Sequence, residues 1–310
     1  MKTDYFASLI LPGDSRRLTF KESAGHFVNA EGVSLTLTPF NDRGQTGFAR
    51  DASVAEHTKV IKKAIRAIKE GKLKKVVLAR QTTLKHPQPH SFMGRFEALV
   101  VAHPKAFRFL IHSGRHGTWL GASPELLLRK RGTHYTTMAL AGTIPAVKIK
   151  NWTWTDKERT EQNYVVEDIK KQLRKIGVTD VNVGPVKISK NGPVAHLKSE
   201  LSFKFKDDPK MLLAALHPTA AMCGFPRKAA LSFIEKHETF DRSLYSGYAC
   251  IEYPNGDIDA FVLIRCMRIL KDKIVLFAGG GIIDTSDPAK EWRETELKMQ
   301  TVLAPLGMAI

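Results

Sequence analysis

Residues 248–278 read YACIEYPNGDIDAFVLIRCMRILKDKIVLFA. This segment holds three apolar stretches rich in the β-branched and aromatic residues that favour strands. They are Tyr248–Tyr253, Ala260–Ile269 and Ile274–Ala278. The turn signals Pro-Asn-Gly at 254–256 and Lys-Asp at 271–272 separate the stretches. Strands joined by such short turns run antiparallel, because a parallel pair needs a long crossover. The segment therefore predicts an antiparallel sheet.

Outward from this segment, apolar runs of strand length alternate with stretches of helical periodicity. Further strands are predicted at Tyr5–Leu11, Val33–Leu37, Lys75–Arg80, Phe107–His112, Thr118–Leu120, Leu126–Arg129 and Tyr135–Leu140. Helices are predicted at Ala52–Glu70, Lys157–Ile176, Met211–Leu216, Ser232–His237 and Asp287–Leu303. The pattern indicates an α+β fold of large antiparallel sheets with outer helices, and not a doubly wound parallel sheet. We expect one large domain over 1–310, with a short strand region at 1–51 and the main region at 52–308.

The charge of the chain is strongly positive. It has 48 Lys+Arg and 31 Asp+Glu among 310 residues, a formal net charge of +17. The excess lies in residues 1–150, which hold 25 basic and 10 acidic residues, against 23 and 21 in 151–310. Such a balance suggests nucleic acid, an anionic membrane surface or an anionic small substrate as partner.

Three cysteines without a CxxC pair disfavour a disulfide framework or a Cys-based zinc site. The N-terminal stretch has too short an apolar core for a signal peptide, and no stretch reaches the ~20 apolar residues of a membrane span. We therefore expect a cytoplasmic protein with no membrane partner.

Charged residues on the last predicted helix fall on one face. Glu291, Glu294 and Lys298 are spaced by three and four residues. For an arbitrary helix this pattern is a solvated Glu–Lys pair. Here an Ala-Gly-Gly-Gly run at 278–281 comes shortly before, and such glycines let backbone N–H groups form an anion-binding nest. The combination raises the alternative of a ligand site.

A carboxylate also falls on the apolar face of the helix predicted at Lys157–Ile176. Glu161, Val165 and Ile169 are four residues apart, so Glu161 faces the core. Buried carboxylates are usually ion-paired, protonated or bound to a metal. Glu161 and Glu294 together would supply the hard oxygen ligands that Mg²⁺ prefers, although an ion pair to an arginine fits the spacing as well.

The same blocks of sequence form a pattern that resembles the chorismate-utilising enzymes, and within them the isochorismate synthases of menaquinone or siderophore type. Seven blocks match in order over about residues 52–305. They are KVVLAR (75–80), GASPELLLR (121–129), ALAGT (139–143), DKERTEQ (156–162), HPTAAMCGFP (217–226), FDRSLYSG (240–247) and AGGGII…SDPAKEWRETELK (278–298). The resemblance implies the layered α+β fold of anthranilate synthase component I, with 52–308 as the chorismate-binding catalytic region.

The resemblance assigns chemistry to single residues. Lys75 matches the lysine that activates water for attack at C2 of chorismate, and Glu125 matches the acid that protonates the departing C4 hydroxyl. Glu161 and Glu294 match magnesium ligands, with Glu291 at an outer carboxylate position. The implied activity is the Mg²⁺-dependent conversion of chorismate to isochorismate, an isomerase reaction.

Further positions match the substrate pocket. His196 matches a histidine beside the ring, and Arg265 with the backbone of Gly279 matches groups that hold a substrate carboxylate. The neighbouring positions are Gly142, Thr143 and Lys298. Chorismate has two carboxylates, which Mg²⁺, an arginine and a glycine nest can neutralise.

Within the family, three positions separate the activities. Aminodeoxychorismate synthases have a nucleophilic lysine where this chain has Ala141, and anthranilate synthases lack the lysine found here at 75. No glutamine amidotransferase subunit is therefore expected. Salicylate synthases, which also eliminate pyruvate, share both features and are the alternative. Met222 stands where isochorismate synthases usually have leucine and salicylate synthases a hydroxyl residue, so it favours the former.

Two rival classes remain. A nucleic-acid-binding protein could use residues 59–80 as a basic face, but the sequence contains no recognisable nucleic-acid-binding module. A non-catalytic chorismate-binding protein is disfavoured because every proposed catalytic and metal position is occupied.

Overall fold

The computed structural model describes residues 5–41, 50–85, 92–151 and 153–310, so parts of the strand region at 1–51 lie outside the described residues. The helices are α1 (Val54–Lys69), α2 (Phe92–Ala102), α3 (Asp156–Lys175), α4 (Pro209–Leu216), α5 (Arg227–His237) and α6 (Pro288–Leu303), with 3-10 turns η1 (Ala146–Asn151) and η2 (Ala304–Leu306). The first strands are β1 (Phe6–Ile10), β2 (Arg17–Ser23), β3 (His26–Val28), β4 (Ser34–Thr38), β5 (Lys75–Lys85), β6 (Phe107–Ser113), β7 (Gly117–Ser123), β8 (Leu126–Arg131) and β9 (His134–Pro145). The others are β10 (Val181–Val183), β11 (Lys187–Asn191), β12 (Val194–Lys204), β13 (Gly224–Phe225), β14 (Tyr248–Glu252), β15 (Ile258–Val262), β16 (Cys266–Ile269) and β17 (Lys273–Ile282).

The strands of the described residues form one continuous antiparallel sheet. From one edge the pairing runs β12–β9–β8–β15–β14–β4–β3–β2, with β10 and β11 both paired to β12. It continues β2–β1–β6–β7–β16–β17–β5–β13. All these pairs are antiparallel, so the α+β fold predicted from the short turns is confirmed.

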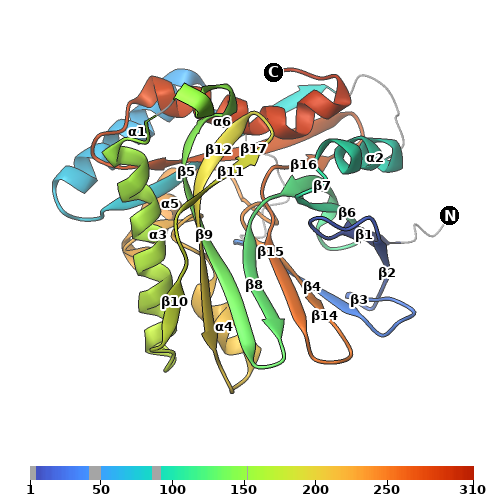
Figure 1. The fold of residues 1–310 in the computed structure, drawn as a ribbon. Coiled ribbons are helices and arrows are strands. Elements are labelled where there is room, and N and C mark those ends of the chain that lie inside the picture. The colour runs from blue at the N-terminus through green and yellow to red at the C-terminus, as the bar shows by residue number, and fades with distance from the viewer. Residues whose placement is uncertain (1–4, 42–49, 86–91, 152) are drawn as a thin grey trace.

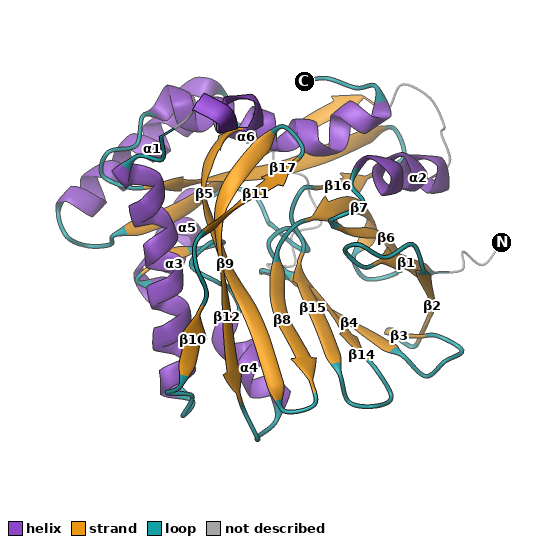
Figure 2. Ribbon diagram, viewed as in Figure 1, coloured by secondary structure: helices purple, strands orange, loops and turns teal. Residues whose placement is uncertain are grey.

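The sheet bends over into two layers. Figure 1 shows β9, β8, β15 and β14 running down the molecule, while β5, β17, β16 and β7 cross above them. The main apolar core contains residues of both halves, among them Phe107, Phe261 and Phe277. Helix α3 packs along β9 and β12, and α6 packs on β17 and α1 (Figure 2). The space between the two halves can therefore be reached by side chains from many elements.

Local sequence explains where the helices that flank this space begin. Ser53 and Glu56 form a reciprocal capping box at the start of α1. Asp287 caps α6 by accepting a hydrogen bond from the backbone N–H of Lys290 at 2.9 Å, and Pro288 occupies the first turn. The predicted helix start at Asp287 is thus confirmed.

One predicted strand is wrong in a way that creates the site. The stretch Ala260–Ile269, in which eight of ten residues are apolar, does not form a single strand, because β15 ends at Val262 and β16 begins at Cys266. β15 pairs with β8 in one layer, whereas β16 pairs with β7 in the other. The chain crosses between layers at 263–265, and Arg265 takes the left-handed backbone conformation, with φ of 51°.

The predicted glycine nest is also wrong. Residues 279–281 are not a loop but the end of β17, where Gly279, Gly280 and Gly281 pair with Ala79, Leu78 and Val77 of β5. None of the three has a positive φ. The glycines are required by close side chains instead, because a Cβ at Gly281 would lie 2.0 Å from Glu161 Oε1.

Several elements have no counterpart in the sequence prediction, namely β10, β11, β12, β13 and α2, whereas β2 and β3 fall within the short strand region predicted at 1–51 without bounds of their own. Helix α2 is apolar over most of its length, so it shows little helical periodicity. Helix α5 begins at Arg227, five residues before its predicted start.

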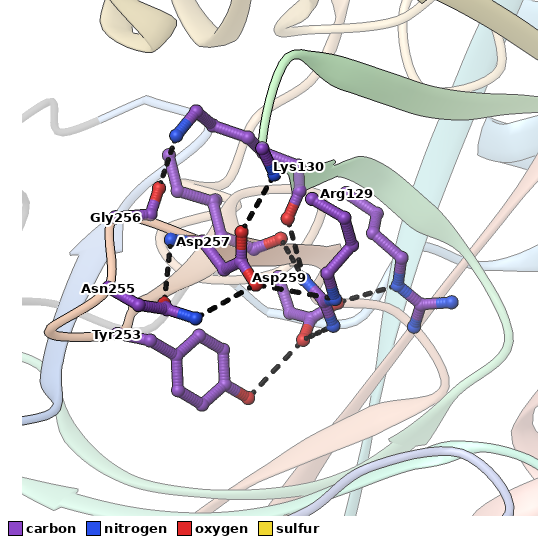
Figure 3. A network of polar contacts seen from close by, with 10 residues as sticks. Arg129, Lys130, Tyr253, Asn255, Gly256, Asp257 and Asp259 are labelled. Carbon is purple, nitrogen blue, oxygen red and sulfur yellow. Dashed lines mark hydrogen bonds and ion pairs between the residues drawn. The ribbon is translucent and has the colours of Figure 1, made fainter.

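A polar network fixes the turn end of the β14–β15 hairpin (Figure 3). Asp259 is fully buried, and its carboxylate accepts hydrogen bonds from Arg129 Nε and Arg131 NH2, both at 2.7 Å, and from Tyr253 OH at 3.2 Å. Both arginines belong to β8, so the network ties the hairpin to the neighbouring strand. Within the described residues, no helix has both the length and the apolar character needed to cross a membrane.

Candidate active site

The predicted site residues converge where the two halves of the sheet meet. A pocket between β5, β9, β12, β17, α3 and α6 is lined by eight of them. These eight are Glu125, Thr143, Glu161, His196, Met222, Arg265, Gly279 and Lys298. Lys75, Gly142, Glu291 and Glu294 do not line this pocket, but the contacts below place them beside it.

Three lysine–carboxylate pairs connect β5, α3 and α6. Lys75 Nζ lies 3.1 Å from Glu161 Oε1, and Lys75 is fully buried. Lys157 Nζ donates to Glu291 Oε1 at 2.7 Å. On α6, Lys298 Nζ donates to Glu294 Oε1 at 2.6 Å and to the backbone oxygen of Gly279 at 2.7 Å. The one-face arrangement predicted for α6 is confirmed, and the Glu294–Lys298 pair is only part of a larger cluster.

The crowding of like charges shifts the acidity of this cluster. Burial and the nearby Glu294 raise the pKa of Glu291 to about 7. Burial also opposes ionisation of Glu161, but Lys75, Lys157 and Lys298 hold its pKa below the usual value. For Lys157 burial again works against the charge, yet Glu291, Glu294 and Glu161 raise its pKa above the ordinary range. The cluster therefore consists of three carboxyl groups, each paired with one lysine.

Glu125 has a different environment. It lies between β7 and β8, is only 2% exposed, and its Oε1 has no hydrogen-bond partner. Burial raises its pKa to about 8, even though Lys75 and Arg265 act in the opposite direction. At neutral pH Glu125 is thus largely protonated and can serve as a proton donor.

Arg265 and His196 form a hydrogen-bonded chain on the other side of the pocket. Arg265 donates through NH2 to His196 Nε2 at 2.6 Å and through NH1 to Thr301 Oγ1 at 2.9 Å. His196 Nδ1 lies 3.2 Å from Thr143 Oγ1 across the β9–β12 pair. Burial and the charge of Arg265 keep the pKa of His196 well below its usual value, so the imidazole is neutral and accepts from the guanidinium. No carboxylate pairs with Arg265 among the described residues, which leaves its charge for an anionic ligand.

Gly142 is required by the backbone. Its φ is +72°, and a Cβ there would lie 2.8 Å from the backbone oxygen of Glu158, so the glycine allows α3 to pack closely on β9. Met222 contributes an apolar wall in the segment between α4 and β13.

Sequence reasoning missed three residues of the site. Lys157 lies one turn before Glu161 on α3, but a lysine on a helix is ordinarily solvated, so this spacing does not mark it as a site residue. Tyr245 lines the pocket, and its hydroxyl would lie 3.1 Å from a Cβ at Gly279. Gly281 allows Glu161 and Lys75 to approach the β17 backbone. Neither of the last two has a local signal, because both depend on the β5–β17 register.

The donor set suits a divalent cation. Glu161, Glu291 and Glu294 offer hard carboxylate oxygens, and Glu291 Oε2 is buried without a hydrogen-bond partner. Over the part of the chain that the structure describes, however, no three acidic or histidine side chains already converge into a ready-made metal cluster. Each of the three carboxylates is paired with a lysine instead.

A known family of proteins shares this fold and these sequence motifs. The model of the chorismate binding enzyme family matches residues 31–307, and the chain belongs to this family. The resemblance inferred from the seven blocks is thereby confirmed.

Among its relatives, the chain is 33% identical over 223 residues to the isochorismate synthase EntC of Escherichia coli K12, an alignment that covers 68% of this chain and 57% of EntC. It is 35% identical over 251 residues to MenF of the same organism, covering 78% and 58%. The chain thus spans under two thirds of the length of these curated relatives. The crystal structure of E. coli MenF, described as a menaquinone-specific isochorismate synthase, matches the fold with a TM-score of 0.83 at 24% identity, covering 97% of this chain and 88% of MenF. A structure described as a putative 2,3-dihydroxybenzoate-specific isochorismate synthase, DhbC from Bacillus anthracis, gives a TM-score of 0.78 at 25% identity, covering 99% and 84%.

Proposed function

We propose that this protein is an isochorismate synthase, which converts chorismate to isochorismate. The observation that carries the proposal is the presence of two buried groups at one site, namely Glu125, which lines the pocket and is largely protonated at neutral pH, and Lys75, which lies beside the pocket against Glu161. A reaction that adds one hydroxyl and expels another needs a base and an acid at the same substrate. Curated relatives that are about one third identical to this chain over the aligned residues have this activity in their names.

The groups of the pocket match the charge of the substrate. Chorismate is a dianion, and Arg265 and Lys298 line the pocket from two sides. Arg265 is buried and bound only to neutral partners, Thr301 and His196, so a substrate carboxylate is the anion that would neutralise it. Lys298 Nζ donates a hydrogen bond to the backbone oxygen of Gly279 and thereby connects α6 to β17 at the wall of the pocket.

Mg²⁺ is part of the proposal. Glu161, Glu291 and Glu294 would hold the ion, since their oxygens are hard ligands and Glu291 Oε2 lacks a partner. A bound divalent cation would neutralise a substrate carboxylate and stabilise the charge that develops on it. The lysines that now pair with these carboxylates would then be released from them, Lys75 among them.

The steps assigned to the chain are proton transfers. Lys75 Nζ acts as the base and accepts a proton from a water molecule as the water oxygen bonds to C2 of chorismate. The ring double bonds shift, the bond from C4 to its hydroxyl oxygen breaks, and Glu125 gives its proton to the departing hydroxyl, which leaves as water. One water enters and one leaves, so the net reaction is an isomerisation. Because water is the nucleophile, the reaction needs no subunit that supplies ammonia.

The test is to incubate the protein with chorismate and Mg²⁺ and to separate the products by chromatography. Isochorismate as the product, absent after treatment with a chelator, supports the proposal. Lys75→Met, which keeps the length of the side chain but not the base, is expected to reduce turnover about 10²–10⁴-fold. Salicylate with pyruvate as final products, or unreacted chorismate with the wild-type protein, would overturn the assignment.

A further inference from the structure

A second cavity, of about 400 Å³, lies between α1, β5 and the end of α5. None of the residues that line it lines the candidate active site. Arg80 belongs to this cavity, and it is five residues from Lys75 on β5, an odd spacing that puts the two side chains on opposite faces of the strand. The two pockets are therefore distinct.

Basic side chains dominate the lining of this cavity. They are Arg50, Lys59, Lys63 and Arg80, with His57 and His237 beside them. The lining contains two carboxylates, and both are engaged: Glu56 pairs with Arg50, and Glu238 accepts from Arg242 Nε at 2.8 Å and from the backbone N–H of Ala79 at 2.7 Å. Lys59 and Lys63 lie one turn apart on the exposed surface of α1 and form no ion pair with a described residue. The cavity thus has an excess of positive charge.

Arg80 provides the sharpest indication of a ligand. It is 3% exposed, yet its partners are the hydroxyl groups of Thr295 and Thr82, at 2.7 and 2.6 Å. The third guanidinium nitrogen, NH2, is buried with no hydrogen-bond partner. A buried guanidinium bonded only to neutral groups is costly unless an anion joins it.

Nearby groups do not fill that role. The Arg80 guanidinium stacks 3.7 Å from the ring centre of Trp292, which fixes its plane. Glu296 and Asp51 act on Arg80 only through space, since Glu296 accepts from Trp292 Nε1, and Asp51 accepts from the backbone N–H and hydroxyl of Thr83. The remaining wall includes the polar residues Gln81 and Thr239 and the apolar residues Val60, Leu78 and Phe240.

We propose that this cavity is a second ligand site, which binds a small organic oxyanion, a carboxylate or a phosphate ester on a compact apolar body, with Arg80 NH2, Lys59 and Lys63 as its donors. The guanidinium provides the buried, pre-oriented contact, and the two lysines draw the anion in from the surface of α1. Val60, Leu78 and Phe240 contact the apolar body. The site is independent of the reaction proposed above.

The test uses phenyl phosphate and benzoate as probes, titrated separately into the protein by isothermal calorimetry. We expect at least one of them to bind with a Kd in the millimolar range or lower. The probe with the lower Kd shows whether the site prefers a phosphate ester or a carboxylate. Lys59→Ala with Lys63→Ala should weaken binding about tenfold. The matched control is Lys62→Ala with Lys69→Ala, two exposed lysines of α1 outside the cavity lining, which should change the Kd less than twofold.

Arg80→Met tests the buried contact. It keeps much of the side-chain volume, and circular dichroism checks that the variant is folded. If it is folded, binding of the probe should be lost. If the variant does not fold, the lysine pair and its control decide alone. No binding of either probe to the wild-type protein, or equal weakening by the two lysine pairs, would overturn the proposal.

Discussion

Glu125 and Glu161 are carboxyl groups of one pocket with opposite acidity, and their neighbours explain the difference. Burial raises the pKa of Glu125 to about 8, because Lys75 and Arg265 compensate for only part of the lost hydration. Around Glu161, three lysines more than offset the same effect of burial and hold its pKa low. One residue is thus suited to give a proton and the other to bind a cation.

The acidity of Glu125 predicts the pH dependence of the proposed reaction. The proton donor is active only when protonated, so kcat/KM for chorismate should fall as the pH rises through about 8. Glu125→Gln cannot donate a proton and should lower kcat by about 10²–10⁴-fold, and the alkaline decline should disappear with it. Rates measured from neutral to alkaline pH, on both proteins, provide the check. An unchanged alkaline decline in Glu125→Gln would assign that decline to another group.

Single residues were the easiest part of the site to predict from the sequence. Glu161 stands out because a carboxylate interrupts an apolar helical stripe, and it is buried as expected. Lys157 has no such signal, since a lysine on a helix is ordinarily solvated, and only the fold brings Glu291 to within 2.7 Å of it. The signal for Glu161 lies within one helix, whereas the Lys157–Glu291 contact joins two helices and leaves no signal in either.

At the scale of elements, β17 controls how closely the charged side chains approach. A Cβ at Gly281 would lie 2.0 Å from Glu161 Oε1 and 3.0 Å from Lys75 Cε. Gly281→Ala has no backbone strain to overcome, because the strand is extended there, but it must displace the Lys75–Glu161 pair. We expect overpacking to cost about 1–3 kcal/mol of unfolding free energy and to reduce kcat at least about tenfold.

Thermal unfolding and steady-state rates test this expectation. Gly184→Ala, in the segment after β10, is the matched control, because its Cβ would meet only the backbone oxygen of Glu200, at 3.3 Å, far from the pocket residues. Its kcat should match that of the wild type. Full activity in Gly281→Ala would show that the position of the pair is unimportant.

The break between β15 and β16 shows why element boundaries were harder to predict. Residues 260–269 are apolar except for Arg265 and Arg268 and contain no glycine or proline, so the local sequence indicates one strand. The break arises because the backbone oxygen of Arg265 accepts from Ala122 N–H in one layer while Leu263 N–H donates to Gly247 in the other. Tertiary pairing overrides local propensity there, and it places Arg265 between the layers.

At the scale of the whole molecule, we expect the positive charge to attract the proposed anionic substrate toward the pocket. The net charge is +17, yet the pocket itself uses only a few of the 48 basic residues. Charges spread over the surface attract a dianion over a distance limited by screening, which is about 10 Å at 0.1 M salt. The excess should therefore speed the encounter with chorismate without taking part in the chemical step.

Measurements at different ionic strengths distinguish the encounter with chorismate from the chemical step. Raising KCl from about 20 to about 500 mM should lower kcat/KM for chorismate by about tenfold, because association is no longer steered. The value of kcat at saturating chorismate should change less than about twofold, since the pairs that shape the site, such as Lys75–Glu161, are buried and poorly screened. Steady-state rates at fixed free Mg²⁺ make the comparison. A kcat/KM that is constant across this range would mean that the surplus charge is surface composition alone, while an equal fall in kcat would place the salt effect inside the pocket.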